Sequence, residues 1–149
     1  MSAPPSPIFT DEEINQHARG NASGMPYLMT AYALECGRTA DDAAAFAGRI
    51  FAPGWEDTRG QGALVAARYM ALNMASGGGV VRSLTGDERH AETRVAGLAS
   101  DEELAFFGLT REDADRFTGT FVPIATYLGL RAAWRREGDE IVVTVEQPG

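Results

Sequence analysis

The sequence predicts a single α+β domain in which a helical N-terminal half packs on an antiparallel sheet built from two β-hairpins. Three observations predict this class. Capping motifs mark four helix starts, a glycine run at residues 77–79 interrupts the helical period, and two hairpin-like segments lie beyond that run. With 149 residues, 44% of them hydrophobic, the chain is long enough for one core. We expect residues 1–9 to form a flexible arm and residues 10–149 to form the domain.

The expected helices are bounded by local signals. A capping box pairs a Ser or Thr with an acidic residue three positions later, and both bond to free backbone N–H groups of the first turn. The pairs are Thr10 with Glu13, Thr39 with Asp42, Ser100 with Glu103, and Thr110 with Asp113. The residues expected to end helices are Gly20, Gly37, the pair Pro53-Gly54, Gly108 and Gly129. Because Pro123 lies within the segment 110–128, we expect a kink or a break there.

The segment 60–75 is apolar on nearly all sides, so we expect a central helix that its neighbours cover on most faces. Arg68 is a charged residue inside this segment. Burying a guanidinium without a partner is costly, so a negative group should face it. We favour an internal Asp or Glu as that group, and the alternative is the carboxylate or phosphate of a ligand.

The segment 130–147 predicts a β-hairpin around Gly138-Asp139, a dipeptide suited to a two-residue type II′ turn. The expected cross-strand pairs are Trp134 with Val143, Ala132 with Val145, Arg136 with Ile141, and Arg131 with Glu146. This register gives the hairpin one almost wholly apolar face and a charge pair on the other face.

A second hairpin is predicted over residues 80–95. Its TGDE string at 85–88 echoes the EGDE string at 137–140. The echo reflects either an internal duplication or chance, and we favour chance because this turn string is common. Together the hairpins would make a four-stranded antiparallel sheet.

The composition narrows the classes of function. A formal net charge of −8 and a pI near 4.7 argue against nucleic-acid partners and anionic membrane surfaces. All 13 basic residues are Arg, which excludes lysine-dependent chemistry. The cause of this bias is either a GC-rich bacterial genome or selection, and we favour the genome. The single Cys36 fits a reducing compartment. We find no signal peptide and no apolar run of about 18 residues, so we expect a cytoplasmic protein.

His90, Glu92 and Arg94 alternate along one strand of the second hairpin, so they should share a face. A histidine beside a carboxylate can act as a general base, and an arginine can hold a substrate carboxylate. His90 and Glu92 are therefore the candidate catalytic residues. The alternative, which we favour, is a solvated strand face with cross-strand charge pairs.

Aromatic residues are numerous enough to line an apolar pocket, although ordinary core packing is the more frequent role at such spacing. The candidate substrate-binding residues are Arg68, Arg94, Trp55, Tyr69, Tyr127 and Trp134. With two histidines and no carboxylate cluster at ligand spacing, we expect no metal and no other cofactor.

Two segments carry a family resemblance: GLTREDAD at 108–115 and YLGLRAAWRREGDEIVVTVEQ at 127–147. They resemble the C-terminal part of the L-2-amino-thiazoline-4-carboxylic acid hydrolase-like family. The matching residues are Asp113, Asp115, Arg135, Gly138 and Asp139. Val142-Val143 stand where that family would carry a Cys-Asp pair. The layout also resembles, more loosely, vinyl-reductase-like small-ligand domains. The resemblance implies a small-molecule enzyme or sensor with a pocket between helices and sheet.

Two functions remain open at this point. The first, which we favour, is a metal-free and cofactor-independent enzyme, hydrolase-like, that acts on a small anionic or ring-containing molecule by acid/base chemistry. The second is a non-catalytic domain that binds a small ligand, such as a tetrapyrrole, or forms a homodimer. A carboxylate or His90 pointing into a pocket would favour the enzyme, whereas a wholly apolar pocket or an exposed Trp134 face would favour binding or dimerisation.

Overall fold

The structure is a computed structural model and describes residues 8–149. The first seven residues of the expected N-terminal arm lie outside the described residues. The helices before the first strand are α1 (Asp11–Glu35), α2 (Ala40–Phe51), the 3-10 helix η1 (Ala52–Thr58) and α3 (Ala63–Ser76). The first hairpin consists of β1 (Val80–Gly86) and β2 (His90–Ala96). The next helices are α4 (Asp101–Phe107), α5 (Arg111–Arg116), the 3-10 helix η2 (Phe117–Thr120) and α6 (Phe121–Tyr127), and the chain closes with β3 (Arg131–Glu137) and β4 (Glu140–Glu146).

The helix starts lie where the capping boxes predict them. In all four pairs the Ser or Thr side chain accepts the backbone N–H of the acidic residue, and the acidic side chain accepts the N–H of its capping partner. The expected ends at Gly37, Gly108 and Gly129 are confirmed, since each glycine has a positive φ just after a helix. α2 ends at Phe51, before Pro53.

One expected helix end is wrong. α1 continues through Gly20 and Pro26 to Glu35. Its later half contains the buried Tyr27 and Thr30, and this packing holds the helix together across two residues that weaken it. The break expected near Pro123 is confirmed, because η2 separates α5 from α6. Pro123 itself lies in the first turn of α6, where its missing N–H costs no helical bond.

The four strands form one antiparallel sheet in the order β1-β2-β4-β3. The register predicted for the second hairpin is confirmed. The pairs are Trp134 with Val143, Ala132 with Val145, Arg136 with Ile141, and Arg131 with Glu146. The fold class is therefore α+β, as the sequence predicts.

The weaker hairpin prediction is also confirmed, because β1 and β2 pair as neighbours. The two hairpins differ in detail. β1 has an irregularity between Val81 and Ser83, and three residues rather than two separate β1 from β2. The central pairing is between β2 and β4, one strand from each hairpin.

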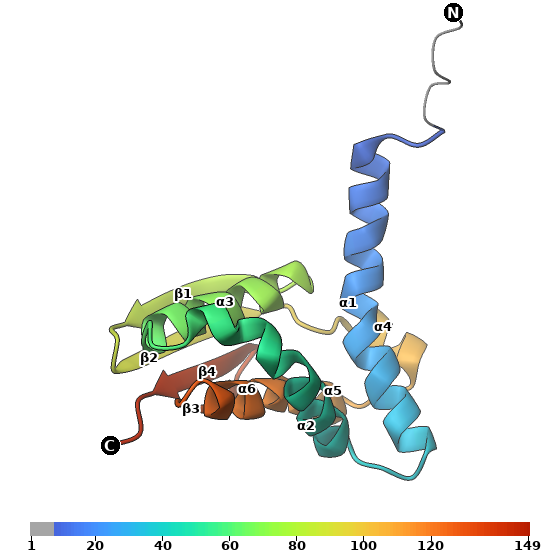
Figure 1. Cartoon of the computed structure of the whole chain (residues 1–149). Helices are drawn as coiled ribbons and strands as arrows, with labels where there is room; N and C mark the ends of the chain where they lie inside the picture. Colours follow the sequence, from blue (N-terminus) through green and yellow to red (C-terminus); the bar gives the residue numbers. More distant parts are fainter. Residues whose placement is uncertain (1–7) are drawn as a thin grey trace, which may run out of the picture.

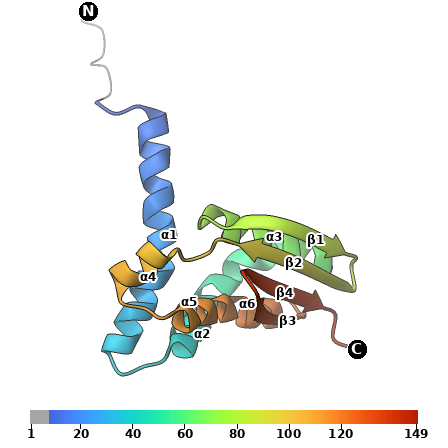
Figure 2. The ribbon, with the colours of Figure 1, turned by 180° about the vertical axis from the view of Figure 1, so that it is seen from behind.

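Helices cover the inner face of the sheet, as the two opposite views show (Figures 1 and 2). α3 packs on β1, β2 and β4, and α6 packs on β3. The inner face of the sheet contributes Ala91, Val95, Ile141, Val143 and Val145 to the core. The side of α3 that meets this face carries Ala63, Ala66, Ala67, Met70 and Met74. These small alanines let the helix lie close to the sheet.

The expectation that Arg68 is buried is wrong. α3 buries a single stripe, and Arg68 lies on its exposed side next to Tyr69 and Leu72, which are exposed as well. Among residues 8–149, Arg68 takes part in no ion pair. Although α3 has apolar residues on nearly all sides, only one side is buried. The apolar residues on its outer side are exposed to solvent.

α1 stands to one side of the molecule, and its N-terminal half is clear of the other elements (Figure 1). Every residue from 11 to 22 is exposed. The later half of α1 packs against α2, α4, α3 and α5. Within residues 8–149, no helix combines the length and the apolar character that a membrane crossing requires.

Candidate functional site

A cavity of about 570 Å³ lies where the later half of α1 meets the rest of the molecule. Its first wall is α1, with Ala22, Ser23, Met25, Pro26, Tyr27 and Met29. The opposite walls are Phe51, Trp55, Asn73, Met74, Ser76, Leu98, Ala99, Ala114, Asp115, Phe117, Thr118, Thr120, Phe121, Ile124 and Ile141. Most of these side chains are apolar, so the cavity favours an apolar occupant.

The α1 wall is built from a segment that brings little bulk. Ala22 and Ser23 line the cavity with small side chains. Pro26 has no N–H, so it cannot donate to the carbonyl of Ala22 as a residue four positions later normally does. On the other side of this wall the helix lies close to α4, where a Cβ at Gly24 would be 3.3 Å from the ring of Phe107. This close contact with α4 holds α1 in place beside the cavity.

The loop after β2 forms a second wall and has an unusual backbone. Ala99 is buried and has a φ of 55°, a left-handed conformation that costs energy for a residue with a Cβ. Arg111 holds this loop, because its Nη1 donates to the carbonyls of Leu98 at 3.1 Å and Ala99 at 2.6 Å. Its Nη2 also bonds to Asp101 at 2.9 Å. The strained turn is thus maintained by its neighbours.

Tyr27 reaches across from α1 to the Ala99 loop. Burial raises the pKa of its hydroxyl to about 12, and the charge of Glu103 adds to this effect, while a backbone hydrogen bond from Ala99 opposes it. The ring lies 6.0 Å from that of Phe107, centroid to centroid. Tyr27 therefore presents a neutral side chain to the cavity at any physiological pH.

Among residues 8–149, Asp115 is the one carboxylate that lines the cavity, and it already has a partner. Its two oxygens accept from Nε and Nη2 of Arg136 at 2.5 Å and 2.7 Å. The hydrogen bond with Asp115 raises the pKa of the Arg136 guanidinium, and burial acts against it. Arg136 lies opposite Ile141 on the apolar face of its hairpin, and this ion pair explains how a charge is tolerated there. The wall carries no net charge at this point.

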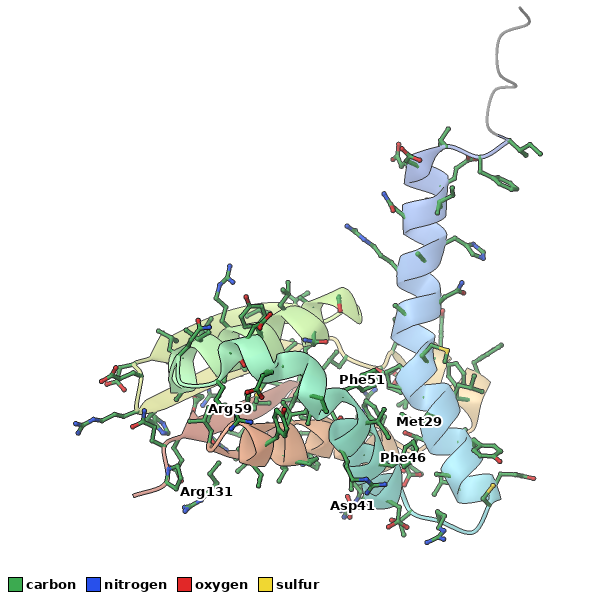
Figure 3. The ribbon with its side chains drawn as sticks, viewed as in Figure 1. Met29, Asp41, Phe46, Phe51, Arg59 and Arg131 are labelled. Carbon is green, nitrogen blue, oxygen red and sulfur yellow. The ribbon has the colours of Figure 1, made fainter. Side chains whose placement is uncertain are left out.

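Aromatic rings form another part of the cavity wall. Trp55 makes edge contacts with Phe121 and with Tyr69, with ring centroids 6.2 Å and 6.3 Å apart. Phe51, at the end of α2, and Met29, on α1, both line the cavity, and Figure 3 labels them on their two helices. Such rings offer flat apolar surfaces for a ring-containing ligand.

Of the substrate-binding residues predicted from the sequence, Trp55 alone lines this cavity. Tyr69 touches Trp55 from the exposed side of α3. Trp134 packs against the main core from β3, so it forms no exposed face. The guanidinium of Arg59 lies 4.6 Å from the ring centre of Tyr127. Arg68 lies on the outer side of α3, as described above.

His90, Glu92 and Arg94 share the outer face of the sheet, which is the face away from the cavity. Glu92 pairs with Arg94 at 2.9 Å and with Arg135 at 3.7 Å, and His90 lies 3.9 Å from Glu146. Arg94 also reaches Glu137 at 3.3 Å and Glu140 at 3.5 Å. This is the arrangement of the alternative interpretation, a strand face with cross-strand charge pairs. The catalytic role of His90 and Glu92 stays a prediction.

The charged side chains on the outer face of the sheet also cover an apolar residue. Val142 is fully buried although it lies on the outer face, opposite Arg94 on β2 and Arg135 on β3. The aliphatic stems of these arginines can shield it from water. The charges on this face therefore have a structural use.

Several cavity residues were not selected from the sequence as site residues, including Tyr27, Met74, Asp115 and Ile124. One local signal does mark the α1 wall. Residues 20–26 combine two glycines and a proline, a composition that weakens a helix, although α1 continues through them. The other segments of the wall carry no pattern of their own that indicates a site.

Within residues 8–149, no group of three or more His, Cys, Asp or Glu side chains is arranged to hold a metal ion. The chain matches no model of a protein family and no curated protein sequence.

Proposed function

We propose that this protein is a non-catalytic binding domain for a small, uncharged and mainly apolar organic molecule held in the cavity beside α1. The observation that carries the proposal is the chemistry of the wall. It is largely apolar, and its carboxylate, Asp115, is neutralised by Arg136.

The size of the cavity fits this role. Sites for small organic ligands usually measure about 300–1,000 Å³, and this cavity measures about 570 Å³. Met25 and Phe51 line it while remaining largely exposed, so they mark its mouth. A ligand can therefore enter between α1 and the end of α2.

The charge balance selects a neutral ligand. An ion placed against apolar walls loses its hydration, which costs free energy. The Asp115 carboxylate does not offset this cost for a cationic ligand, because its charge is already neutralised by Arg136. Polar groups of a ligand would instead meet the hydroxyls of Thr118 and Thr120 or the amide of Asn73, all of which line the cavity. The rings of Trp55 and Phe121 favour a ligand that contains a ring.

The proposal takes up the second of the two functions expected from the sequence. The family resemblance implies a small-ligand pocket, whereas this proposal is supported by the cavity between α1 and the rest of the molecule. The residues expected to do acid/base chemistry lie on the other face of the sheet, where Glu92 pairs with Arg94 and His90 lies 3.9 Å from Glu146.

Binding of Nile red, a neutral ring-containing dye that brightens in apolar surroundings, tests the proposal. Ser23→Phe would place a ring into the cavity from the α1 wall. We expect it to weaken Nile red binding by at least about tenfold, equivalent to about 1.4 kcal/mol. The measurement is a fluorescence titration of the folded wild-type and variant proteins.

The matched control is Gln16→Phe, the same ring on the same side of α1 but in its exposed N-terminal half. This variant and His90→Ala, which alters the outer sheet face, should bind the dye as the wild type does. Wild-type affinity in Ser23→Phe, or no saturable binding to the wild type, would contradict the proposal.

A further inference from the structure

The outward side of α1 carries an apolar seam, which we define as Ile14, Ala18, Asn21, Met25, Leu28 and Tyr32. Their spacing alternates between four and three residues, which is the repeat of helices that pair along their length. All six are exposed, and the four large side chains are between 52% and 69% exposed. No charged residue interrupts the seam, because Asp11 and Glu35 lie beyond its two ends.

Apart from Met25, which also lines the mouth of the cavity, the seam lies on the side of α1 that faces away from the rest of the molecule. At 100° per residue, the seam positions cluster about half a turn away from Tyr27 and Thr30, which are buried. The N-terminal half of α1 also stands clear of the other elements in both views (Figures 1 and 2). A second helix can therefore lie along the seam without meeting the sheet or the other helices of the same chain.

The exposed half of α1 needs an explanation of its own. Residues 11–22 form more than three turns of helix without burying a side chain. Segments of this length are marginal in water when nothing packs against them, even with a capping box at Thr10. A partner along the seam would supply the missing contacts.

We propose that α1 pairs with α1 of a second copy of this chain, antiparallel, around a two-fold axis that passes between Asn21 and Met25 on the seam side of the helix. A two-fold interface must be complementary to itself. Reversing the seam about this axis sets Ala18 opposite Leu28 and Asn21 opposite Met25, so that each smaller side chain meets a larger one. Each exposed N-terminal half then lies along the later half of the partner's α1.

One further observation fits this pairing. The seam from Ile14 to Tyr32 extends over about 27 Å, which is long enough for several layers of contacts. Met25 belongs to both the seam and the cavity wall, but Ile14, Leu28 and Tyr32 do not line the cavity, so the pairing can be tested without the proposed ligand.

Sedimentation equilibrium of the full chain tests the inference. The wild type should have twice the 15.9 kDa of the chain, and Leu28→Glu should have the mass of one chain, because it places a charge in the seam. The control is Gln16→Glu, which adds the same charge on the opposite side of the helix and should leave the dimer intact. A monomeric wild type, or a dimer that survives Leu28→Glu, would overturn the proposal.

Disulfide formation tests the direction of the helices. In a Cys36→Ser background, Ala18→Cys copies mixed with Leu28→Cys copies should crosslink into mixed dimers under mild oxidation. Copies with Ala18→Cys alone should not crosslink. Efficient crosslinking through Ala18→Cys alone would indicate parallel helices and overturn the antiparallel arrangement.

Discussion

At the scale of single residues, Asp115 and Arg136 show what a local pattern can and cannot reveal. The hairpin register places Arg136 on the apolar face opposite Ile141, and this was predictable. Its partner was not, because Asp115 lies 21 residues earlier on a different element. The guanidinium crosses from β3 to α5 to reach it, and the pair leaves the cavity wall without net charge.

For Arg68, the position of the residue itself could not be predicted. The sequence of α3 is apolar on all sides, so it does not reveal which side meets the sheet. In the structure the alanine-rich side does, and Tyr69, Leu72 and Arg68 are left outside. That side carries Met70 and Met74 as well as the alanines, and the small alanine side chains allow close packing on the strands.

Tyr27 gives a prediction about pH. Burial raises the pKa of its hydroxyl to about 12 from an ordinary value near 10, so folding favours the neutral form. This contribution to the free energy of unfolding is complete below pH 10 and is lost as the pH rises from 10 to 12. Urea denaturation across this range should therefore show a steeper loss of stability in the wild type than in Tyr27→Phe. Parallel pH dependence of the two proteins would contradict the burial of this hydroxyl.

At the scale of elements, the sequence was most informative where signals are local. The four capping boxes and the paired strands each lie within a few residues, so helix starts and hairpin registers could be predicted. The end of α1 could not, because contacts with α2, α4 and α5 hold the helix past Gly20. Tertiary packing outweighed a local helix-breaking signal there.

The contact between α2 and the segment after α5 depends on a glycine. A Cβ at Gly48 would overlap the Pro123 ring and the Thr120 carbonyl. We expect Gly48→Ala to lower the free energy of unfolding by about 1–3 kcal/mol, as overpacking usually does. Thermal or urea denaturation would measure this change.

Gly20→Ala is the matched control for that substitution. Gly20 is exposed within α1, and nothing lies within 4 Å of its Cβ position. Alanine should raise stability there by about 0.5–1 kcal/mol through helix propensity. Equal effects of the two substitutions would contradict the close packing at Gly48.

At the scale of the whole molecule, two similar units meet at the centre of the sheet. α3 with β1 and β2 corresponds in order to α6 with β3 and β4, and the strand order β1-β2-β4-β3 places the units symmetrically about the β2–β4 pairing. The turns differ in length, so the internal duplication suggested by the two turn strings stays a hypothesis.

The cavity could not be predicted from the sequence, because it exists only when distant segments meet. α1, the end of α2, α3, the loop after β2, the α5–α6 region and β4 all contribute to its wall. Trp55 was predicted as a binding residue from its aromatic character alone. Its position beside Phe121 and across from α1 required the complete fold.

The central claim is that this cavity binds a neutral apolar ligand. A crystal structure of the protein with Nile red bound tests it most directly. We expect the dye's ring system inside the cavity, between Ser23 on α1 and the ring of Trp55. Dye bound on the outer face of the sheet near His90, with the cavity filled by the protein's own side chains, would contradict the claim.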